Sequence, residues 1–387
     1  MINNRNQFKL SSFYFFFFAA LGAFVPYWST YLKSLGFSPA QIGELLMIVM
    51  ASKIFAPYLL AWLSDHLKKR LIIIQLSLVA AVITFAGVIP YQSFAWFAFI
   101  MAVFGFFWNT TLPLFEALTF NYLGENTHRY SLVRLWGSIG FIVMVITLPY
   151  LIEGEKIANL PYFILGLLFL NALTTFLVTD KQNSVQSAKP SPILKTLKKP
   201  IVIALLLACA LQSLSHGAYY TFFTIYLEEH GYSRNMAGWM WGLGVSAEVL
   251  LFIIMHRLLH RYCVCQLFII ALFVTAIRWL MLALWVDNLF ILILSQVFHA
   301  ASFGLFHATA IYLTHELFPG RLQGRGQALY AGMSFGLGGS LGHLLSGYTW
   351  GSMGSTWTFL ASGIIALVGA LIAAKFISQD RLESELG

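Results

Sequence analysis

Long apolar stretches separated by short polar segments dominate this sequence. Twelve of them are long enough to cross about 30 Å of hydrocarbon, which an α-helix of roughly 20 residues spans. The run Phe13 to Phe18 continues into further apolar residues without a small-residue cleavage site, so it is a first membrane helix and not a signal peptide. We predict an all-α polytopic membrane protein with helices at residues 10–34, 40–63, 71–89, 94–122, 130–151, 159–179, 200–227, 235–256, 265–286, 288–315, 325–349 and 354–377.

One connection is longer and more polar than the others. Residues 181–199 contain Lys189-Pro190-Ser191-Pro192 and four further lysines, a composition typical of a linker. We therefore predict an N-terminal six-helix bundle at residues 1–180, a cytoplasmic linker at 181–199 and a C-terminal six-helix bundle at 200–387. Two six-helix repeats with the substrate between them are a transporter architecture.

Charge placement indicates the topology. Charged residues make up 10% of the chain and hydrophobic residues 59%, whereas soluble proteins carry about 25% charged residues. If alternate loops from the N-terminus are cytoplasmic, 18 of the 23 Lys and Arg residues lie inside, 3 outside and 2 within the membrane. This positive-inside bias predicts two cytoplasmic termini. It also accounts for the net charge of +8 without any nucleic-acid partner.

The cysteines and histidines do not indicate a metal or disulfide centre. Cys209 lies within a predicted helix, and Cys263 and Cys265 lie near a cytoplasmic loop, where we interpret them as a plain reduced pair. His256 and His260 are spaced by four residues, but no further histidine cluster accompanies them. We expect no metal, no cofactor and no catalytic residue.

Glu116 and Arg134 lie in neighbouring helices that a short polar loop joins. At 1.5 Å rise per residue, Glu116 lies roughly 9 Å and Arg134 roughly 6 Å above that loop, so their depths match. Charges at membrane depth are costly, usually pair, and mark a substrate or ion path. We predict a direct contact between the two and assign both to the substrate site of a carrier. Glu116 is also a candidate proton carrier.

Lys53 is the most informative single charge. It lies about 18 Å along its helix from Asp65 at the cytoplasmic end, and a lysine stem reaches only roughly 6 Å. A positive charge at that depth suits an anionic substrate. The alternatives are an ion pair with Glu116 or Glu248, or a lysine that burial keeps neutral.

The second half contains Arg278, Glu248 and His299 within predicted helices. Arg278 either pairs with Glu248, despite an expected depth difference of about 8 Å, or binds the substrate carboxylate, for which a guanidinium is suited. His299 and Glu248 are candidate proton carriers. Tyr219 and Tyr220 are assigned to an aromatic-lined substrate pocket.

One predicted loop carries a resemblance to a known family, and its sequence is Trp62-Leu63-Ser64-Asp65-His66-Leu67-Lys68-Lys69-Arg70. It resembles the signature Gly-x-Leu-x-Asp-Arg-x-Gly-Arg-Arg of the major facilitator superfamily. Asp65 and the basic tail match, whereas Lys68 stands at the second glycine of the signature. The resemblance implies a conformational or gating role for Asp65 and Arg70.

Two branches of that superfamily resemble the chain further. The lactose permease branch has counterparts of five intramembrane residues, namely Glu116, Arg134, Glu248, Arg278 and His299. Ser302 stands at its proton-carrying glutamate and His216 at its helix 7 aspartate. The 3-phenylpropionic acid transporter branch is more similar, through the segments at residues 26–33, 38–43, 133–138 and 217–220 and through Glu248.

The closer resemblance implies a secondary active transporter. It would take up a small aromatic carboxylate such as 3-phenylpropionate with a proton, by alternating access at a site between the bundles. Its partners would be this substrate, the proton and the lipid bilayer, and it would work as a monomer in the bacterial inner membrane. The alternatives are a proton symporter of a sugar or nucleoside, or a drug exporter. A membrane enzyme would carry histidine clusters, and a channel a pore-lining filter, which the sequence lacks.

Overall fold

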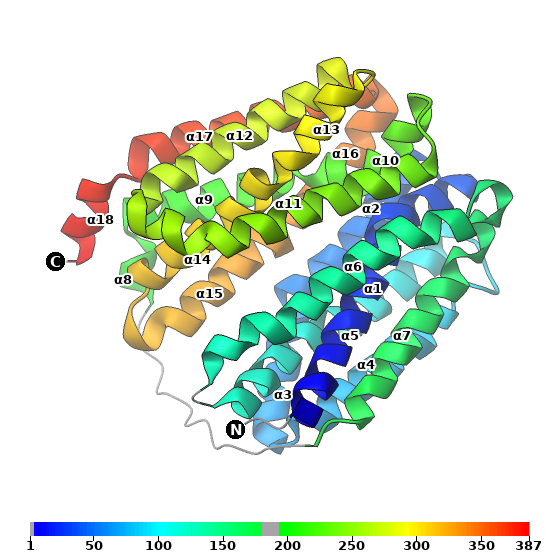
Figure 1. Cartoon of the computed structure of the whole chain (residues 1–387), viewed down its shortest axis with the longest axis horizontal. Helices are drawn as coiled ribbons and strands as arrows, with labels where there is room; N and C mark the ends of the chain where they lie inside the picture. Colours follow the sequence, from blue (N-terminus) through cyan, green and yellow to red (C-terminus); the bar gives the residue numbers. More distant parts are fainter. Residues whose placement is uncertain (1–3, 125, 180–192, 387) are drawn as a thin grey trace. The chain divides into compact units, whose positions relative to one another are not determined.

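The computed structural model describes residues 4–124, 126–179 and 193–386. Within these ranges the regular structure is helical and no strand occurs, which confirms the all-α class, and each of the twelve expected segments is helical. The first half contains α1 (Asn4–Ser34), α2 (Pro39–Ala51), η1 (Ser52–Ile54), α3 (Ala56–Leu67), α4 (Arg70–Ala86), α5 (Phe94–Leu123), η2 (Thr127–Arg129), α6 (Tyr130–Leu151), η3 (Gly154–Asn159) and α7 (Leu160–Phe176) (Figure 1).

The second half repeats the helical pattern with more interruptions. It contains α8 (Leu194–Leu197), α9 (Pro200–Ser215), α10 (Gly217–Glu229), α11 (Arg234–Arg261), α12 (Val264–Trp285), α13 (Leu289–Val297), η4 (Ala300–Leu305), α14 (Phe306–Leu317), η5 (Gly320–Leu322), α15 (Gln323–Ala331), η6 (Gly332–Gly338), α16 (Gly339–Met353), α17 (Ser355–Phe376) and α18 (Gln379–Leu386). Across the described ranges, ten helices are long and apolar enough to cross a membrane, and α4 is a shorter apolar helix. The chain is therefore a multi-pass membrane protein.

Two compact units divide the chain. Unit 1 comprises Met1–Val185 and Thr221–Gly242, and unit 2 comprises Gln186–Tyr220 and Leu243–Gly387. Residues 221–242, which the sequence assigns to the C-terminal bundle, thus group with the first half. Most of the predicted linker, residues 181–192, lies outside the described residues, and only the short α8 is seen at its end. The bundle boundaries remain a prediction.

Four expected helices are interrupted. The break at η1 lies one turn before Pro57, which has no N–H to donate to the Lys53 carbonyl. Another break separates α9 from α10 at His216 and Gly217. The segments η4 and η6 are π-helical, and such bulges within α-helices frequently mark functional sites.

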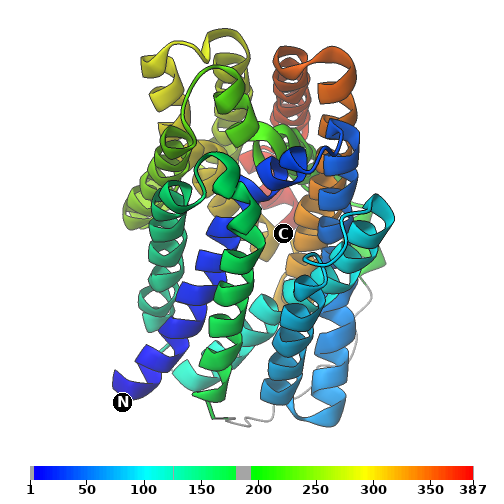
Figure 2. The same cartoon turned by 90° about the vertical axis from the view of Figure 1, so that its right-hand side faces the viewer.

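In unit 1, α1 packs along α6 and α7 (Figure 2). Glycine permits this close approach, because a Cβ at Gly140 would overlap the Phe15 carbonyl and one at Gly22 would lie 2.9 Å from the Phe141 oxygen. On the opposite side, Phe13 of α1 stacks on Phe115 of α5, with ring centroids 3.5 Å apart. These contacts fix α1 between the helices that carry Glu116 and Arg134.

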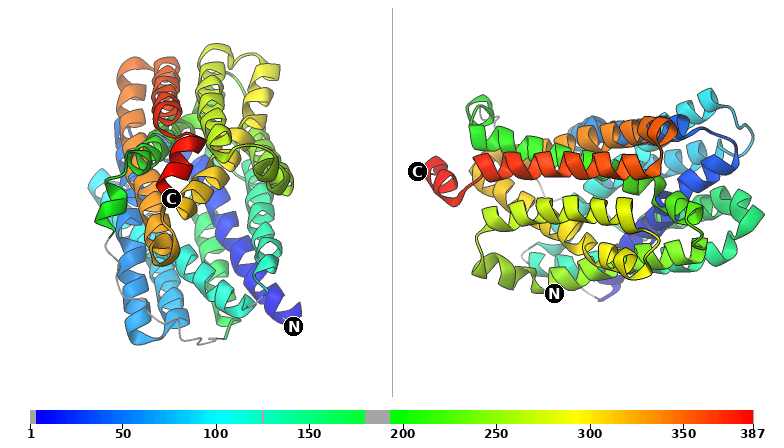
Figure 3. Two further views of the ribbon diagram at one scale, coloured as in Figure 1. Left: turned by 90° about the vertical axis from the view of Figure 1, so that its left-hand side faces the viewer. Right: turned by 90° about the horizontal axis from the view of Figure 1, so that it is seen from above.

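In unit 2, α12 lies alongside α17 and α17 packs on α9 (Figure 3). The buried apolar side chains of α9, α12, α14 and α17 form one hydrophobic cluster. Gly338 of η6 lies against the Ala210 backbone of α9, and Gly217 lies against Gly342 of α16, so no side chain would fit at either point. This packing encloses the polar residues described next.

Candidate functional site

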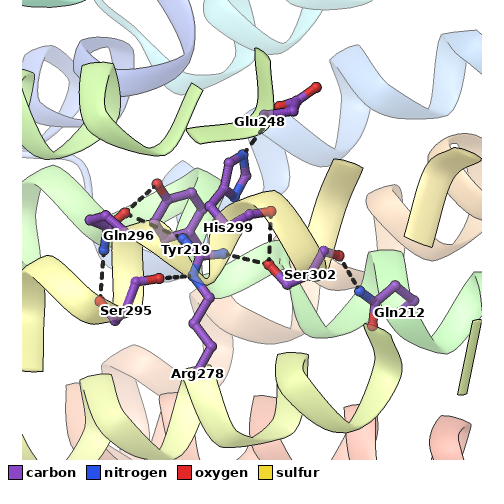
Figure 4. Close-up of polar contacts among 8 residues, drawn as sticks. All are labelled: Gln212, Tyr219, Glu248, Arg278, Ser295, Gln296, His299 and Ser302. Atoms are coloured by element: carbon purple, nitrogen blue, oxygen red, sulfur yellow. Dashed lines mark hydrogen bonds and ion pairs between the residues drawn. The ribbon is translucent and has the colours of Figure 1, made fainter. Parts of the chain in front are cut away.

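A buried arginine organises the polar centre of unit 2. Arg278 of α12 is wholly buried. Its Nε donates to the Ser295 carbonyl at 2.8 Å, its Nη1 to Ser302 Oγ at 3.2 Å and its Nη2 to Gln296 Oε1 at 3.3 Å (Figure 4). The three acceptors come from α13 and η4, which follow α12 in the chain. All three are neutral.

Aromatic rings complete the surroundings of the guanidinium. Arg278 Cζ lies 4.3 Å from the centroid of the Tyr219 ring and 4.6 Å from that of Trp279, distances typical of cation–π contacts. The Tyr219 hydroxyl donates to Gln296 Oε1 at 3.0 Å, so this oxygen accepts bonds from both Tyr219 and Arg278. The Tyr220 ring lies 5.5 Å from Tyr219, which places both predicted tyrosines at this centre.

Glu248 contacts His299, not Arg278. The His299 Nε2 and Glu248 Oε2 atoms lie 3.7 Å apart, whereas no ion pair joins Arg278 to a carboxylate in the part of the chain that the structure describes. Of the two interpretations of Arg278, pairing with Glu248 is therefore wrong for this structure. The physical reason is the expected depth mismatch, together with the π-helical turn of η4, which presents Ser302 to the guanidinium.

Two glycines let α11 approach His299. A Cβ at Gly244 would lie 3.4 Å from the His299 ring, and one at Gly304 would lie 3.1 Å from Glu248 Cγ. Small residues at these positions bring the Glu248 and His299 side chains together, as expected at close helix contacts. The two predicted proton-carrying residues are thus neighbours (Figure 4).

A second buried histidine lies at the break between α9 and α10. His216 Nδ1 lies 2.9 Å from the Gln212 carbonyl, which can only accept, so Nδ1 carries the hydrogen. Its ring meets Trp279 edge-on at 4.8 Å and stacks on Tyr220 at 5.8 Å. His216 Nε2 and His299 Nδ1 are buried without a hydrogen-bond partner. Two ring nitrogens in this centre are therefore open to a proton, a water or a ligand.

Lys53 lies within η1, the break between α2 and α3, and is partly buried. Asn109 of α5 stabilises this break, because its amide donates to the Val49 carbonyl at 2.8 Å and to Ser52 Oγ at 2.9 Å. Gly105 allows α5 to come this close, since a Cβ there would lie 3.1 Å from Val49. Among the residues described, none forms an ion pair with Lys53.

Glu116 and Arg134 form no direct ion pair within 4.0 Å among the described side chains. Glu116 accepts a hydrogen bond from the Tyr130 hydroxyl at 2.8 Å. Arg134 instead lies over the Phe18 ring, with Cζ 3.8 Å from its centroid, and Gly137 leaves the space for this stack. Where we expected Arg134 to contact the Glu116 carboxylate, the hydroxyl of Tyr130, one turn earlier on α6, forms a hydrogen bond with it instead.

Asp65 and Arg70 form an ion pair of 2.8 Å across the turn between α3 and α4. Lys68 ends α3 with a φ of +54°, the only positive φ of a non-glycine residue in the described ranges. This is the position of the second glycine in the loop signature. The left-handed backbone that a glycine adopts freely is therefore present here, with lysine in its place.

Two ion pairs gather at the far end of unit 1 from that turn. Lys33 Nζ lies 2.7 Å from Glu229 Oε1, and Arg234 Nε lies 2.7 Å from Glu228 Oε1. Arg234 also donates to the Ile152 carbonyl. They join the ends of α1, α6, α10 and α11, which belong to opposite halves of the sequence.

Sequence reasoning missed Gln296, Ser295 and Gln212 in these centres, and it noted Ser302 only through the resemblance to the lactose permease branch. Gln296, Ser295 and Ser302 coordinate Arg278, and Gln212 donates to Thr275 Oγ1 at 2.8 Å and to the Ser302 carbonyl at 2.6 Å. All of them are uncharged, so a search for intramembrane charges passes over them. The signal available was an amide side chain inside an otherwise apolar helix, which needs a partner there.

Comparison with known proteins shows similarity along nearly the whole chain. The model of the MFS_1 like family matches residues 7–361. A protein described as a probable 3-phenylpropionic acid transporter from Escherichia coli (strain K12) is 28% identical, over 94% of this chain and 96% of that protein. The maltose permease of Geobacillus stearothermophilus is 26% identical, over 96% and 95% respectively. The crystal structure of the nucleoside transporter NupG superposes with a TM-score of 0.83 at 18% identity, covering 96% of this chain and 99% of that one.

Proposed function

Because the chain belongs to the MFS_1 like family, we propose that it takes up a small aromatic carboxylate together with a proton. Membership makes it a secondary transporter of the major facilitator superfamily and not an enzyme. The proposal adds the substrate class, such as 3-phenylpropionate, the driving ion and the direction. It also includes a monomer in the bacterial inner membrane with both termini cytoplasmic.

The observation that carries the proposal is the uncompensated charge of Arg278. A buried guanidinium is costly unless it is paired, and here its neighbours are neutral acceptors and aromatic rings. A carboxylate that binds beside Ser302 and Gln296 would supply the missing negative charge. Arginine suits this task, because its planar donors match the two oxygens of a carboxylate.

The rest of the substrate can be inferred from the surrounding rings. Tyr219, Tyr220 and Trp279 offer faces and edges on which an aromatic ring can pack. Lys53 of unit 1 is a partly buried cation and a further candidate partner for an acid. The name of the Escherichia coli relative points to the same class of acid, whereas the names of the maltose and nucleoside relatives keep a neutral polar substrate as the rival.

Proton coupling is inferred from the neighbouring pair Glu248 and His299. Both can carry a proton within the membrane, and they lie 3.7 Å apart. The positive Arg278 opposes an added positive charge nearby, and a bound carboxylate removes this opposition. By linkage, each ligand then favours the other by the same factor. A monocarboxylate and a proton would thus move together.

Alternating access requires contacts that break when the outer side opens. The ion pairs Lys33–Glu229 and Glu228–Arg234 are suited to this role, because they join segments from the two halves of the sequence. The Lys33–Glu229 pair is exposed, and such pairs contribute only about 0–1 kcal/mol, so this pair can open without a large barrier. In this proposal Asp65 and Arg70 serve the corresponding transition at the other end.

Uptake by the purified protein in liposomes tests the proposal. With an inward proton gradient, labelled 3-phenylpropionate should accumulate, the outer medium should become more alkaline, and a protonophore should abolish both. Maltose and uridine should neither accumulate nor compete. Accumulation that persists without the proton gradient and depends on sodium would refute proton symport. Competition by the neutral compounds but not by the acid would refute the anionic substrate.

A further inference from the structure

Two thiols of unit 2 converge on one side-chain oxygen. The Sγ atoms of Cys263 and Cys265 lie 3.3 Å and 4.0 Å from Gln379 Oε1. The orientation of this amide is fixed, because Gln379 Nε2 donates to Glu383 Oε1 at 2.8 Å and leaves Oε1 as the acceptor. A thiol is a weak donor, so both cysteines in their reduced form suit this acceptor. We call this cluster the thiol clasp.

The thiol clasp connects α12 to the C-terminal helix α18. Gln379 is the first residue of α18, and α18 packs against α14 (Figure 3). Within α18, Leu382 is 4% exposed and belongs to the hydrophobic cluster of unit 2, together with Leu317 and Phe318. The helix has only eight residues, too few to be stable alone. Its docked state therefore depends on its tertiary contacts, among them Leu382, the clasp and Arg381, whose Cζ lies 5.6 Å from the Phe376 ring centroid.

Cys263 and Cys265 are placed for reaction with each other. Cys263 is partly exposed and caps α12 through its backbone only, so its thiol does not serve the helix. Cys265 is buried on the first turn of α12. Residues two apart at a helix start have Cα atoms about 5.4 Å apart, within the range of about 4.4–6.8 Å that disulfides require.

We propose that Cys263 and Cys265 form a reversible disulfide that releases α18. The oxidant is a small external disulfide. The Cys263 sulfur attacks one of its sulfur atoms, forms a mixed disulfide and releases one small thiol. The Cys265 sulfur then attacks Cys263, closes the intramolecular S–S bond and releases the second small thiol. Two electrons pass to the external disulfide, and the two protons end on the released thiols.

Oxidation releases α18 because it removes the S–H donors of Cys263 and Cys265. The disulfide has no S–H group, so Gln379 Oε1 loses both of its thiol contacts at once. Losing a hydrogen bond of about 1 kcal/mol shifts a local equilibrium about fivefold. Because an eight-residue helix is not stable alone, a shift of this size raises the fraction of α18 that is open. The clasp thus makes the docking of the C-terminal helix depend on thiol oxidation.

The test uses the purified full chain in nanodiscs with 4,4′-dithiodipyridine as oxidant. We expect release of two equivalents of 4-thiopyridone, loss of two hydrogens in the peptide that holds residues 263–265, and amide hydrogen exchange in α18 faster by about fivefold. Dithiothreitol should restore the two hydrogens of the peptide and the slow amide exchange of α18. Cys209, which is fully buried, should stay a thiol.

Two variants separate the clasp from general damage. Cys263→Ser keeps a donor for Gln379 but cannot form the disulfide, so its α18 exchange should stay slow with oxidant. Gln379→Ala should show fast exchange in α18 even when reduced. Wild-type protein that retains a mixed disulfide would overturn the proposal. So would a disulfide that forms without faster exchange in α18.

Discussion

Ser302 lies beside the Arg278 guanidinium, so a glutamate at this position would supply an internal carboxylate where we expect that of the substrate. The Ser302 Oγ to Arg278 Nη1 distance is 3.2 Å, and a glutamate reaches further, so its carboxylate can stay within 4 Å of the guanidinium. At an effective dielectric constant near 20, that pair attracts by about 4 kcal/mol before desolvation is subtracted. The variant Ser302→Glu should therefore occupy the site with a tethered anion.

The expected effect is a selective loss of acid binding. In this variant an aromatic acid must displace the internal carboxylate from Arg278. Its binding free energy is therefore less favourable by about one charge-assisted hydrogen bond, about 1.5–3 kcal/mol. This converts to about ten- to a hundredfold weaker binding. Titration calorimetry with 3-phenylpropionate and with its neutral amide measures the difference. The amide should bind equally well to parent and variant, because it does not compete for the charge.

The matched control is Ser302→Gln, which adds nearly the same volume without the charge. Overpacking of this buried position costs about 1–3 kcal/mol of stability in both variants, so their comparison isolates electrostatics. Ser302→Ala removes a neutral acceptor, together with a long hydrogen bond to the His299 carbonyl, and should bind the acid within about threefold of the parent protein. Equal acid affinities of the glutamate and glutamine variants would refute the assignment of Arg278 to the substrate.

Three further predictions concern unit 1. Lys53→Gln should weaken binding of the acid by about ten- to a hundredfold and of its amide much less; equal losses in calorimetry would mean that Lys53 supports packing instead. Tyr130→Phe should remove a hydrogen bond to Glu116 of about 1.5–3 kcal/mol, and a double-mutant cycle with Glu116→Leu, which has no acceptor, should by thermal unfolding return a coupling of that size, with additivity as the contrary result. Lys68→Gly should stabilise the protein by up to about 1 kcal/mol, because the left-handed backbone costs a lysine about 1–2 kcal/mol and glycine loses part of this through chain entropy. The neighbouring Lys69, with a φ of −131°, is the control, and Lys69→Gly should instead lower the unfolding midpoint.

The helices themselves were predictable because hydropathy is a local property. The expected segments 94–122 and 130–151 agree with α5 and α6 to within one residue at each end, since their apolar content sets their length. The expected segment 40–63 was less accurate, because α3 continues to Leu67 and η1 interrupts the helix. Pro57 in this sequence was the available signal for that interruption.

The partners of the charged residues were not predictable from depth alone. Depth fixes the position of a residue along the membrane normal but not the direction of its side chain. Each residue of an α-helix turns by about 100°, and a π-helical turn adds a further offset. The segment η4 contains such a turn, and it brings Ser302, three residues after His299, to Arg278. Glu248 consequently meets His299, and Arg278 is left among neutral acceptors.

The sequence by itself determined the class of protein, the positions of the membrane helices and the existence of charges that lipid cannot tolerate unpaired. These follow from the number of apolar residues in a row and from the cost of a charge in hydrocarbon, which do not depend on the neighbours. The tertiary structure decided which groups satisfy those charges. Tyr130 bonds Glu116, Phe18 covers Arg134, and three neutral oxygens hold Arg278. It also placed residues 221–242 with unit 1. Such pairings depend on helix rotation and on glycine-permitted close approach, which arise only when the helices pack together.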